Sequence, residues 1–142
     1  MKRIIHTNSD GGVSVIVPSV EALQSMTIEQ IALKDVPKGL MYQIVEEEEI
    51  PQDRMFRNAW VLDNGVKEDN AKATDIAKEK VRAWRELEFK KNDIALQNAI
   101  VDDDQEVRAD AVARREYLRD KPAECDNKSN DELKVIIKNL EM

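Results

Sequence analysis

Short apolar segments alternate with turn residues over the first part of the chain. Ile4 and Ile5 begin the first apolar segment, and residues 13–17 form a second that is β-branched except at Ser14. Residues 8–12 lie between the two segments and include two glycines, which adopt positive φ without steric cost. The pattern predicts a β-hairpin with a loop of about five residues. Val13, Val15 and Val17 are expected to share one face of the second strand.

A short helix and a third strand are expected next. Thr27 and Gln30 have the spacing of a capping box, in which each side chain bonds a backbone N–H of the other residue. Pro37 lies where the helix should end, and residues 41–45 read as the third strand. The apolar face of the helix would consist of Ile28, Ile31 and Ala32.

A second short helix is predicted after residue 52. Asp53 is a favourable N-cap, and Phe56 and Trp60 follow at i, i+4 spacing, which would place both rings on one side of this helix. The sequence Asp-Asn-Gly at 63–65 indicates a turn.

A helical pattern then extends from Asn70, a plausible N-cap, to about residue 100. At 1.5 Å per residue such a helix is about 45 Å long. Its apolar stripe falls within an arc of about 150° when residues are placed at 100° intervals. The stripe consists of Ala73, Ile76, Ala77, Val81, Trp84, Leu87, Ile94, Ala95 and Ala99.

Two further helices follow the long one. Residues 102–104 are all Asp and should cap a helix that runs to about residue 120, before Pro122. The short connection favours an antiparallel helical hairpin. After a polar linker at 123–128, Ser129 and Glu132 form a second capping box that begins the C-terminal helix. The apolar face of the helix before Pro122 is thin, with Val107, Ala111 and Leu118.

These elements predict an α+β fold with two parts. Residues 1–69 would form a small antiparallel sheet with short helices, and residues 70–142 a long helical hairpin followed by a C-terminal helix. The division follows composition, because all four glycines and three of the four prolines precede residue 70.

Composition narrows the functional classes. The 142 residues include 22 Lys and Arg against 29 Asp and Glu, a net charge of −7 with no basic patch, which argues against nucleic-acid binding. No apolar run reaches the roughly 20 residues of a membrane helix. With one Cys and one His, the chain lacks the ligand spacings of a metal site. We therefore expect no catalytic residue, metal or cofactor, and no membrane partner.

The roles of His6, Cys125 and the acidic run Glu46–Glu49 stay open, and each has a simple structural interpretation. His6 is expected to be a partly exposed residue at a strand end, and Cys125 an unreactive thiol in the linker. The acidic run Glu46–Glu49 reads first as a solvated strand end. It could also contact a basic partner, or imitate a phosphate backbone in an inhibitor of a DNA-binding enzyme.

The long helix carries more apolar surface than the thin second helix can cover. The front domain, a second copy of the chain or another protein must then cover the remainder. The residues predicted to contact a partner are Trp84, Leu87, Phe89, Leu96 and Ile100.

Two stretches of sequence resemble known proteins. Residues 27–37 (TIEQIALKDVP) and 50–60 (IPQDRMFRNAW) are similar to the front half of small accessory proteins of tailed phages and prophages. The ending Arg-Glu-Tyr-Leu-Arg-Asp-Lys-Pro at 115–122, after a helix rich in Ala and Arg, resembles that of phage tail and tail-fibre assembly chaperones.

The resemblance implies a non-enzymatic assembly factor that binds a phage tail or tail-fibre protein. Such a protein would work in the host cytoplasm or in association with the virion. Two other functions remain open at this point: a minor structural component of the virion, and an acidic inhibitor of a host nucleic-acid-binding defence protein.

Overall fold

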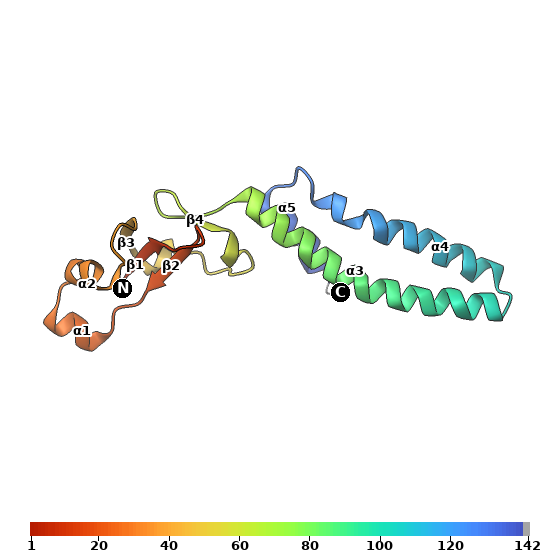
Figure 1. Ribbon diagram of the computed structural model, residues 1–142, viewed down its shortest axis with the longest axis horizontal. Coiled ribbons are helices and arrows are strands. Elements are labelled where there is room, and N and C mark those ends of the chain that lie inside the picture. The colour runs from red at the N-terminus through yellow and green to blue at the C-terminus, as the bar shows by residue number, and fades with distance from the viewer. Residues whose placement is uncertain (141–142) are drawn as a thin grey trace. The chain divides into compact units, whose positions relative to one another are not determined.

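A computed structural model describes residues 1–140, and its fold is α+β. The chain divides into two compact units, Met1–Lys72 and Ala73–Met142. The first unit holds the strands and the short helices, and the second is helical (Figure 1).

A three-stranded antiparallel sheet organises the first unit. Strand β1 (Lys2–Thr7) lies between β2 (Val13–Ile16) and β3 (Tyr42–Glu46). The expected hairpin and the third strand are thus confirmed, and Ile5 pairs with Val15 in the hairpin register. Gly11 allows the turn between β1 and β2, because its φ is +79°.

Each face of this sheet packs against a different apolar cluster. On one face Ile4 contacts Ile31 and Ala32 of helix α2 (Ile28–Asp35), whose capping box of Thr27 and Gln30 is present as expected. A shorter helix, α1 (Val20–Ser25), precedes α2 and was not anticipated from the sequence. Val17 lies beyond the end of β2 and is exposed, so its expected place on the face of Val13 and Val15 is wrong.

The second face buries Ile5, Val13, Ile50 and Trp60. Trp60 is not helical: it begins β4 (Trp60–Leu62), which pairs with β5 (Val66–Glu68) around the expected turn at 63–65.

The helix predicted after Asp53 is therefore wrong. Only two short 3-10 turns, η1 (Glu47–Glu49) and η2 (Arg57–Ala59), form in this region. Asp53 accepts a hydrogen bond from the Met55 amide at 2.9 Å, the i to i+2 contact of a turn. Burying Trp60 against the sheet outweighs the weak local preference expressed by the i, i+4 spacing.

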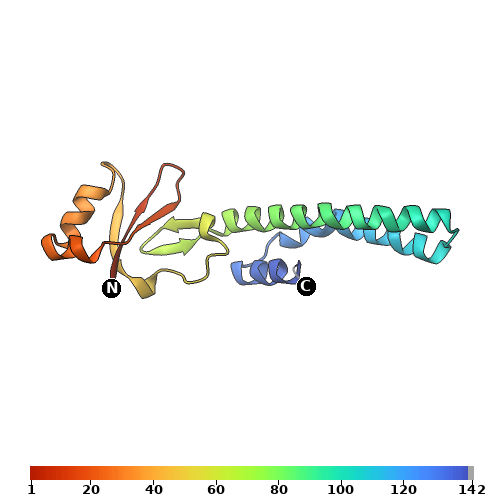
Figure 2. The ribbon, with the colours of Figure 1, turned by 90° about the horizontal axis from the view of Figure 1, so that it is seen from below.

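The long helix and the hairpin are confirmed. Helix α3 (Asn70–Val101) is followed by α4 (Gln105–Asp120), which runs antiparallel beside it (Figures 1 and 2). Asp104 caps α4 by accepting from the Val107 amide at 3.1 Å. Asn70 is not the cap of α3: it is the first helical residue, and Asp69 accepts from the Lys72 amide at 3.1 Å instead.

The end of the described chain returns to the first half of α3. A 3-10 turn, η3 (Lys121–Cys125), leads to helix α5 (Asn130–Leu140), which begins with the expected capping box of Ser129 and Glu132. Figure 2 shows α5 beside α3. Ile137 and Leu140 of α5 line a small pocket together with Lys80, Ala83 and Trp84 of α3.

The buried face of α3 contains part of the predicted stripe, together with Asn92, which the stripe did not include. Its buried side chains are mostly small, and a polar residue lies among them: Ala73, Ala77, Val81, Asn92 and Ala99. Leu87 and Ile94 also belong to the predicted stripe, and each is 60% exposed, so the stripe is only partly covered. Small residues allow α4 and α5 to approach α3 closely, so the larger side chains remain outside.

Candidate functional site

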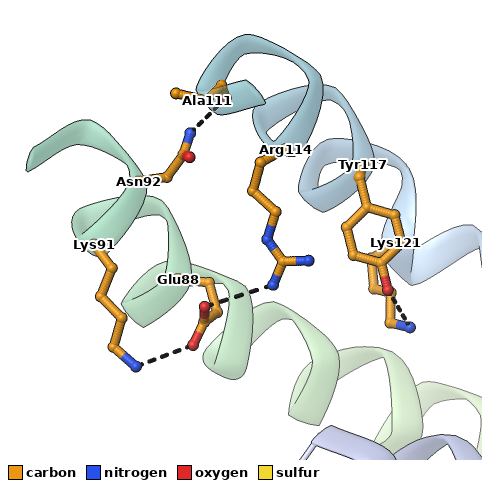
Figure 3. A network of polar contacts seen from close by, with 7 residues as sticks. All are labelled: Glu88, Lys91, Asn92, Ala111, Arg114, Tyr117 and Lys121. Atoms are coloured by element: carbon orange, nitrogen blue, oxygen red, sulfur yellow. Dashed lines mark hydrogen bonds and ion pairs between the residues drawn. The ribbon is translucent and has the colours of Figure 1, made fainter. Parts of the chain in front are cut away.

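Two hydrogen bonds, one buried and one exposed, join side chains of α3 to the backbone of α4. Asn92, which is buried, donates its amide N–H to the Ala111 carbonyl at 2.9 Å (Figure 3). Two turns away, Arg85 donates from Nη1 to the Arg119 carbonyl at 3.0 Å. These two bonds join residues at matching antiparallel positions and therefore fix the register of the two helices.

A network of charged and aromatic side chains lies along one edge of the hairpin. Glu88 accepts from Lys91 at 3.2 Å and lies 3.6 Å from Arg114 of α4 (Figure 3). The Arg114 guanidinium carbon lies 5.6 Å from the centre of the Trp84 ring and 4.9 Å from that of Tyr117. These cation–π contacts engage both rings within the chain, although Tyr117 remains 42% exposed.

A different side of α3 presents an apolar stripe that the described chain leaves uncovered. Leu87 and Ile94 are each 60% exposed, and Val101 is 83% exposed. They recur every seven residues, a spacing that keeps side chains within about 40° of one another over two repeats. The stripe lies on the same side of α3 as Lys80 and Ala83, which are nearer the start of the helix. At those two residues the last turn of α5 lies against α3. Residues 1–140 supply no helix for the rest of it.

Two exposed lysines flank this stripe. Lys90 and Lys91 lie about 40° to 60° on either side of Leu87 and Ile94 when α3 is viewed along its axis. Lys91 has an ion pair with Glu88, whereas Lys90 has none among the described residues. An exposed apolar stripe flanked by cations is suited to an amphipathic helix whose own flanks are acidic.

The opposite side of α3 carries a second apolar group, formed by Phe89, Leu96 and Ile100. Phe89 and Leu96 are half-buried, while Ile100 is 53% exposed. Phe89 lies at a groove of about 550 Å³ between α3 and α4. The other residues lining this groove are Asp93, Val112, Arg115, Glu116 and Arg119.

The structure therefore divides the five residues predicted to contact a partner. Leu87 lies on the uncovered stripe, and Phe89, Leu96 and Ile100 lie on the groove side, about 140° to 180° around the helix. Trp84 lies under Arg114 and beside α5. Ile94 was placed on the predicted stripe but not among the partner-contact residues, and Val101 was not singled out. The seven-residue recurrence of Leu87, Ile94 and Val101 was the signal that could have found them.

The acidic run is partly paired within its own unit. Arg3 contacts Glu47 at 3.2 Å, and the terminal amine of Met1 lies 3.9 Å from Glu46. Glu49 accepts from the backbone amide of Glu46 at 2.8 Å. The run is exposed, and three of its four carboxylates have contacts within the chain.

His6 and Cys125 lie in separate units. His6 is buried rather than partly exposed as expected, because β1 is the central strand of the sheet; its Nδ1 lies 2.6 Å from the Thr7 carbonyl oxygen. Cys125 is buried at the end of η3 rather than in an open linker. Burial raises the pKa of the Cys125 thiol, which disfavours the reactive thiolate.

Residues 1–140 contain neither a cluster of metal-binding side chains nor a helix that could cross a membrane. No group of three His, Cys, Asp or Glu side chains in this range is placed to hold a metal ion. No helix in the same range has the length and apolar character needed to cross a membrane.

Comparison with protein-family models, with curated proteins and with solved structures finds no significant match to the chain.

Proposed function

We propose that this protein is a non-enzymatic assembly factor that binds a tail or tail-fibre protein of a tailed phage through its helical unit. One observation carries the binding role: Leu87, Ile94 and Val101 form an apolar stripe on α3 that is at least 60% exposed at each position. The phage context is supported by the resemblance of residues 27–37, 50–60 and 115–122.

The bound segment is an amphipathic helix with acidic flanks. It lies along α3 beyond the end of α5, so that α5 and the bound helix cover successive parts of one surface. Its apolar side chains cover Leu87, Ile94 and Val101, and its carboxylates approach Lys90 and Lys91. Exposed apolar segments on an unassembled virion protein would be kept from aggregating in this way.

The binding free energy that this contact contributes can be worked out from the exposed fraction of the Ile94 side chain. Full burial of an isoleucine side chain contributes about 1.5–3 kcal/mol. Three-fifths of Ile94 is exposed, so a bound helix gains roughly 1–2 kcal/mol from this residue, about five- to thirty-fold in Kd.

The test is co-expression of the chain with the tail and tail-fibre proteins of a phage or prophage genome that encodes it. The unmodified chain should raise the soluble fraction of one of these proteins and co-purify with it. Ile94→Asp should reduce both effects at least about fivefold, with the circular dichroism of the purified variant unchanged. Val135→Asp is the matched control, because Val135 is 56% exposed on α5, away from the stripe.

Three outcomes would count against the proposal. Failure of the unmodified chain to solubilise or bind any of these tail and tail-fibre proteins removes the assembly role. Equal loss in Val135→Asp and Ile94→Asp means that the effect is general rather than a property of the stripe. Loss in Ile100→Asp but not in Ile94→Asp moves the contact to the groove side of α3.

A further inference from the structure

A small polar pocket in the first unit contains two cationic side chains. It has a volume of about 220 Å³ and lies between the β1–β2 turn, the residues before β4 and the first turn of α3. All its lining residues precede residue 73 and so belong to one unit. Its polar side chains are Asn8, Asp10, Arg57, Asn58 and Lys72.

Among residues 1–140, neither cation forms an ion pair with a carboxylate. Arg57 is half-buried with its guanidinium carbon 4.4 Å from the centre of the Trp60 ring, and it makes no ion pair with any residue of the described chain. The Lys72 ammonium has one contact there, the Gly11 carbonyl oxygen at 3.5 Å. Two cations without an ion pair at one pocket are notable because residues 1–72 contain eight Lys and Arg against twelve Asp and Glu.

The electrostatic surroundings of Arg57 also favour an anion. Burial, and then the positive charge of Arg54, lower the pKa of the Arg57 guanidinium. Both effects mean that the folded protein holds this charge at a cost, which a bound anion would offset.

The β1–β2 turn presents a further donor to the pocket. Asn8 Oδ1 accepts from the amides of Asp10 at 3.0 Å and Gly12 at 2.9 Å, which fixes the orientation of its side chain. Asn8 Nδ2 remains available as a donor, since it has no hydrogen bond within the described chain. Gly12 keeps this arrangement open, because a Cβ at residue 12 would lie 3.3 Å from Asn8 Nδ2.

We propose that this pocket binds a phosphate group, either as inorganic phosphate or as a small phosphomonoester. Arg57 provides the planar fork of donors that matches phosphate oxygens, Lys72 provides a second positive charge, and the Asn8 amide provides a neutral donor. The pocket is large enough for a phosphate with a small substituent. Asp10 opposes this binding, because its carboxylate belongs to the same pocket and repels an anion.

The test is a titration of the full chain with inorganic phosphate at constant ionic strength, followed by NMR of backbone and side-chain amides. Phosphate should produce saturable shifts at Gly12 and at the Asn8 side chain, and chloride should not. Arg57→Gln and Lys72→Gln should each weaken binding at least about fivefold. Asp10→Asn should strengthen it severalfold, an opposite sign that general damage to the fold would not produce.

Lys67→Gln is the matched control, since Lys67 is an exposed lysine of β5 in the same unit that does not line the pocket. A parallel titration with phosphoserine distinguishes the two ligands. Tighter binding of phosphoserine than of inorganic phosphate indicates a phosphomonoester, and the reverse order indicates free phosphate. The proposal is overturned if phosphate and chloride produce the same shifts, or if Arg57→Gln and Lys72→Gln behave as Lys67→Gln does. Acetate binding as tightly as phosphate would also overturn it.

Discussion

Replacing Asn92 by Ala tests how the hairpin is held in register. Asn92 is buried between α3 and α4 and donates to the Ala111 carbonyl at 2.9 Å. Removing this hydrogen bond costs about 1 kcal/mol, and the space left by the amide adds roughly 1 kcal/mol. The Ala111 carbonyl lies inside α4, where the helix provides it with a backbone donor, so the substitution leaves no unpaired acceptor there.

The change also raises helix propensity, and a matched control removes this contribution. Asn98 is exposed on the same helix, and Asn98→Ala should stabilise the protein by roughly 0.5 kcal/mol through propensity alone. Relative to Asn98→Ala, we expect Asn92→Ala to lower the free energy of unfolding by about 1–2 kcal/mol. Asn92→Leu restores the packed volume without the donor and should lie closer to the unmodified chain.

The measurement is urea unfolding followed by far-UV circular dichroism, with amide hydrogen exchange in α3 and α4 to assign the change to the hairpin. For an m value of about 1.5 kcal/mol/M, the expected difference lowers the midpoint by roughly 1 M relative to the Asn98→Ala control. If Asn92→Ala and Asn98→Ala unfold at the same midpoint, the hydrogen bond to Ala111 does not stabilise the hairpin and the reasoning fails.

Two further predictions concern ionisable groups of the helical unit. Burial raises the pKa of Cys125 above its usual 9.0, so the stability that it contributes is present below about pH 9 and declines as the pH rises through the raised value. Cys125→Ala should remove that decline in the free energy of unfolding measured with urea. Mass spectrometry should find the thiol of the unmodified protein alkylated only under conditions that unfold the chain, and rapid alkylation of the folded protein would contradict this. Hydrogen bonds from the backbone amide and side chain of Ser129 lower the pKa of Glu132 from 4.5, so its contribution to the start of α5 is present above about pH 4.5 and is lost as the pH falls through the lowered value. In the unmodified protein, amide hydrogen exchange at the start of α5 should become faster below pH 4, and in Glu132→Gln this change should be absent. An identical pH profile in the two proteins would show that the carboxylate has no such role.

Local signals in the sequence determined most of the helical elements. The capping boxes at Thr27 and Ser129 and the Asp residues before α4 define helix starts through contacts that span only three residues. Such contacts depend little on the rest of the fold, so the sequence alone predicts them. The β1–β2 hairpin was predictable for the same reason, because a short loop joins its strands.

Elements that depend on distant contacts were missed or wrongly predicted. Trp60 has helical spacing from Phe56, yet it is buried in β4 against a sheet formed by residues far from it in the sequence. The pocket of Arg57 and Lys72 likewise joins segments that no local pattern links.

In the candidate site, a single helix has some features that local sequence predicts and others that depend on distant contacts. The sequence by itself determined that α3 is long, amphipathic and followed by a returning helix, because periodicity and capping are encoded within each segment. Only the tertiary structure decided which apolar side chains are enclosed. Close approach of α4 and α5 selects alanines, Val81 and Asn92 for the interior, since helix packing depends on the volumes of both surfaces, and the larger Leu87 and Ile94 remain outside.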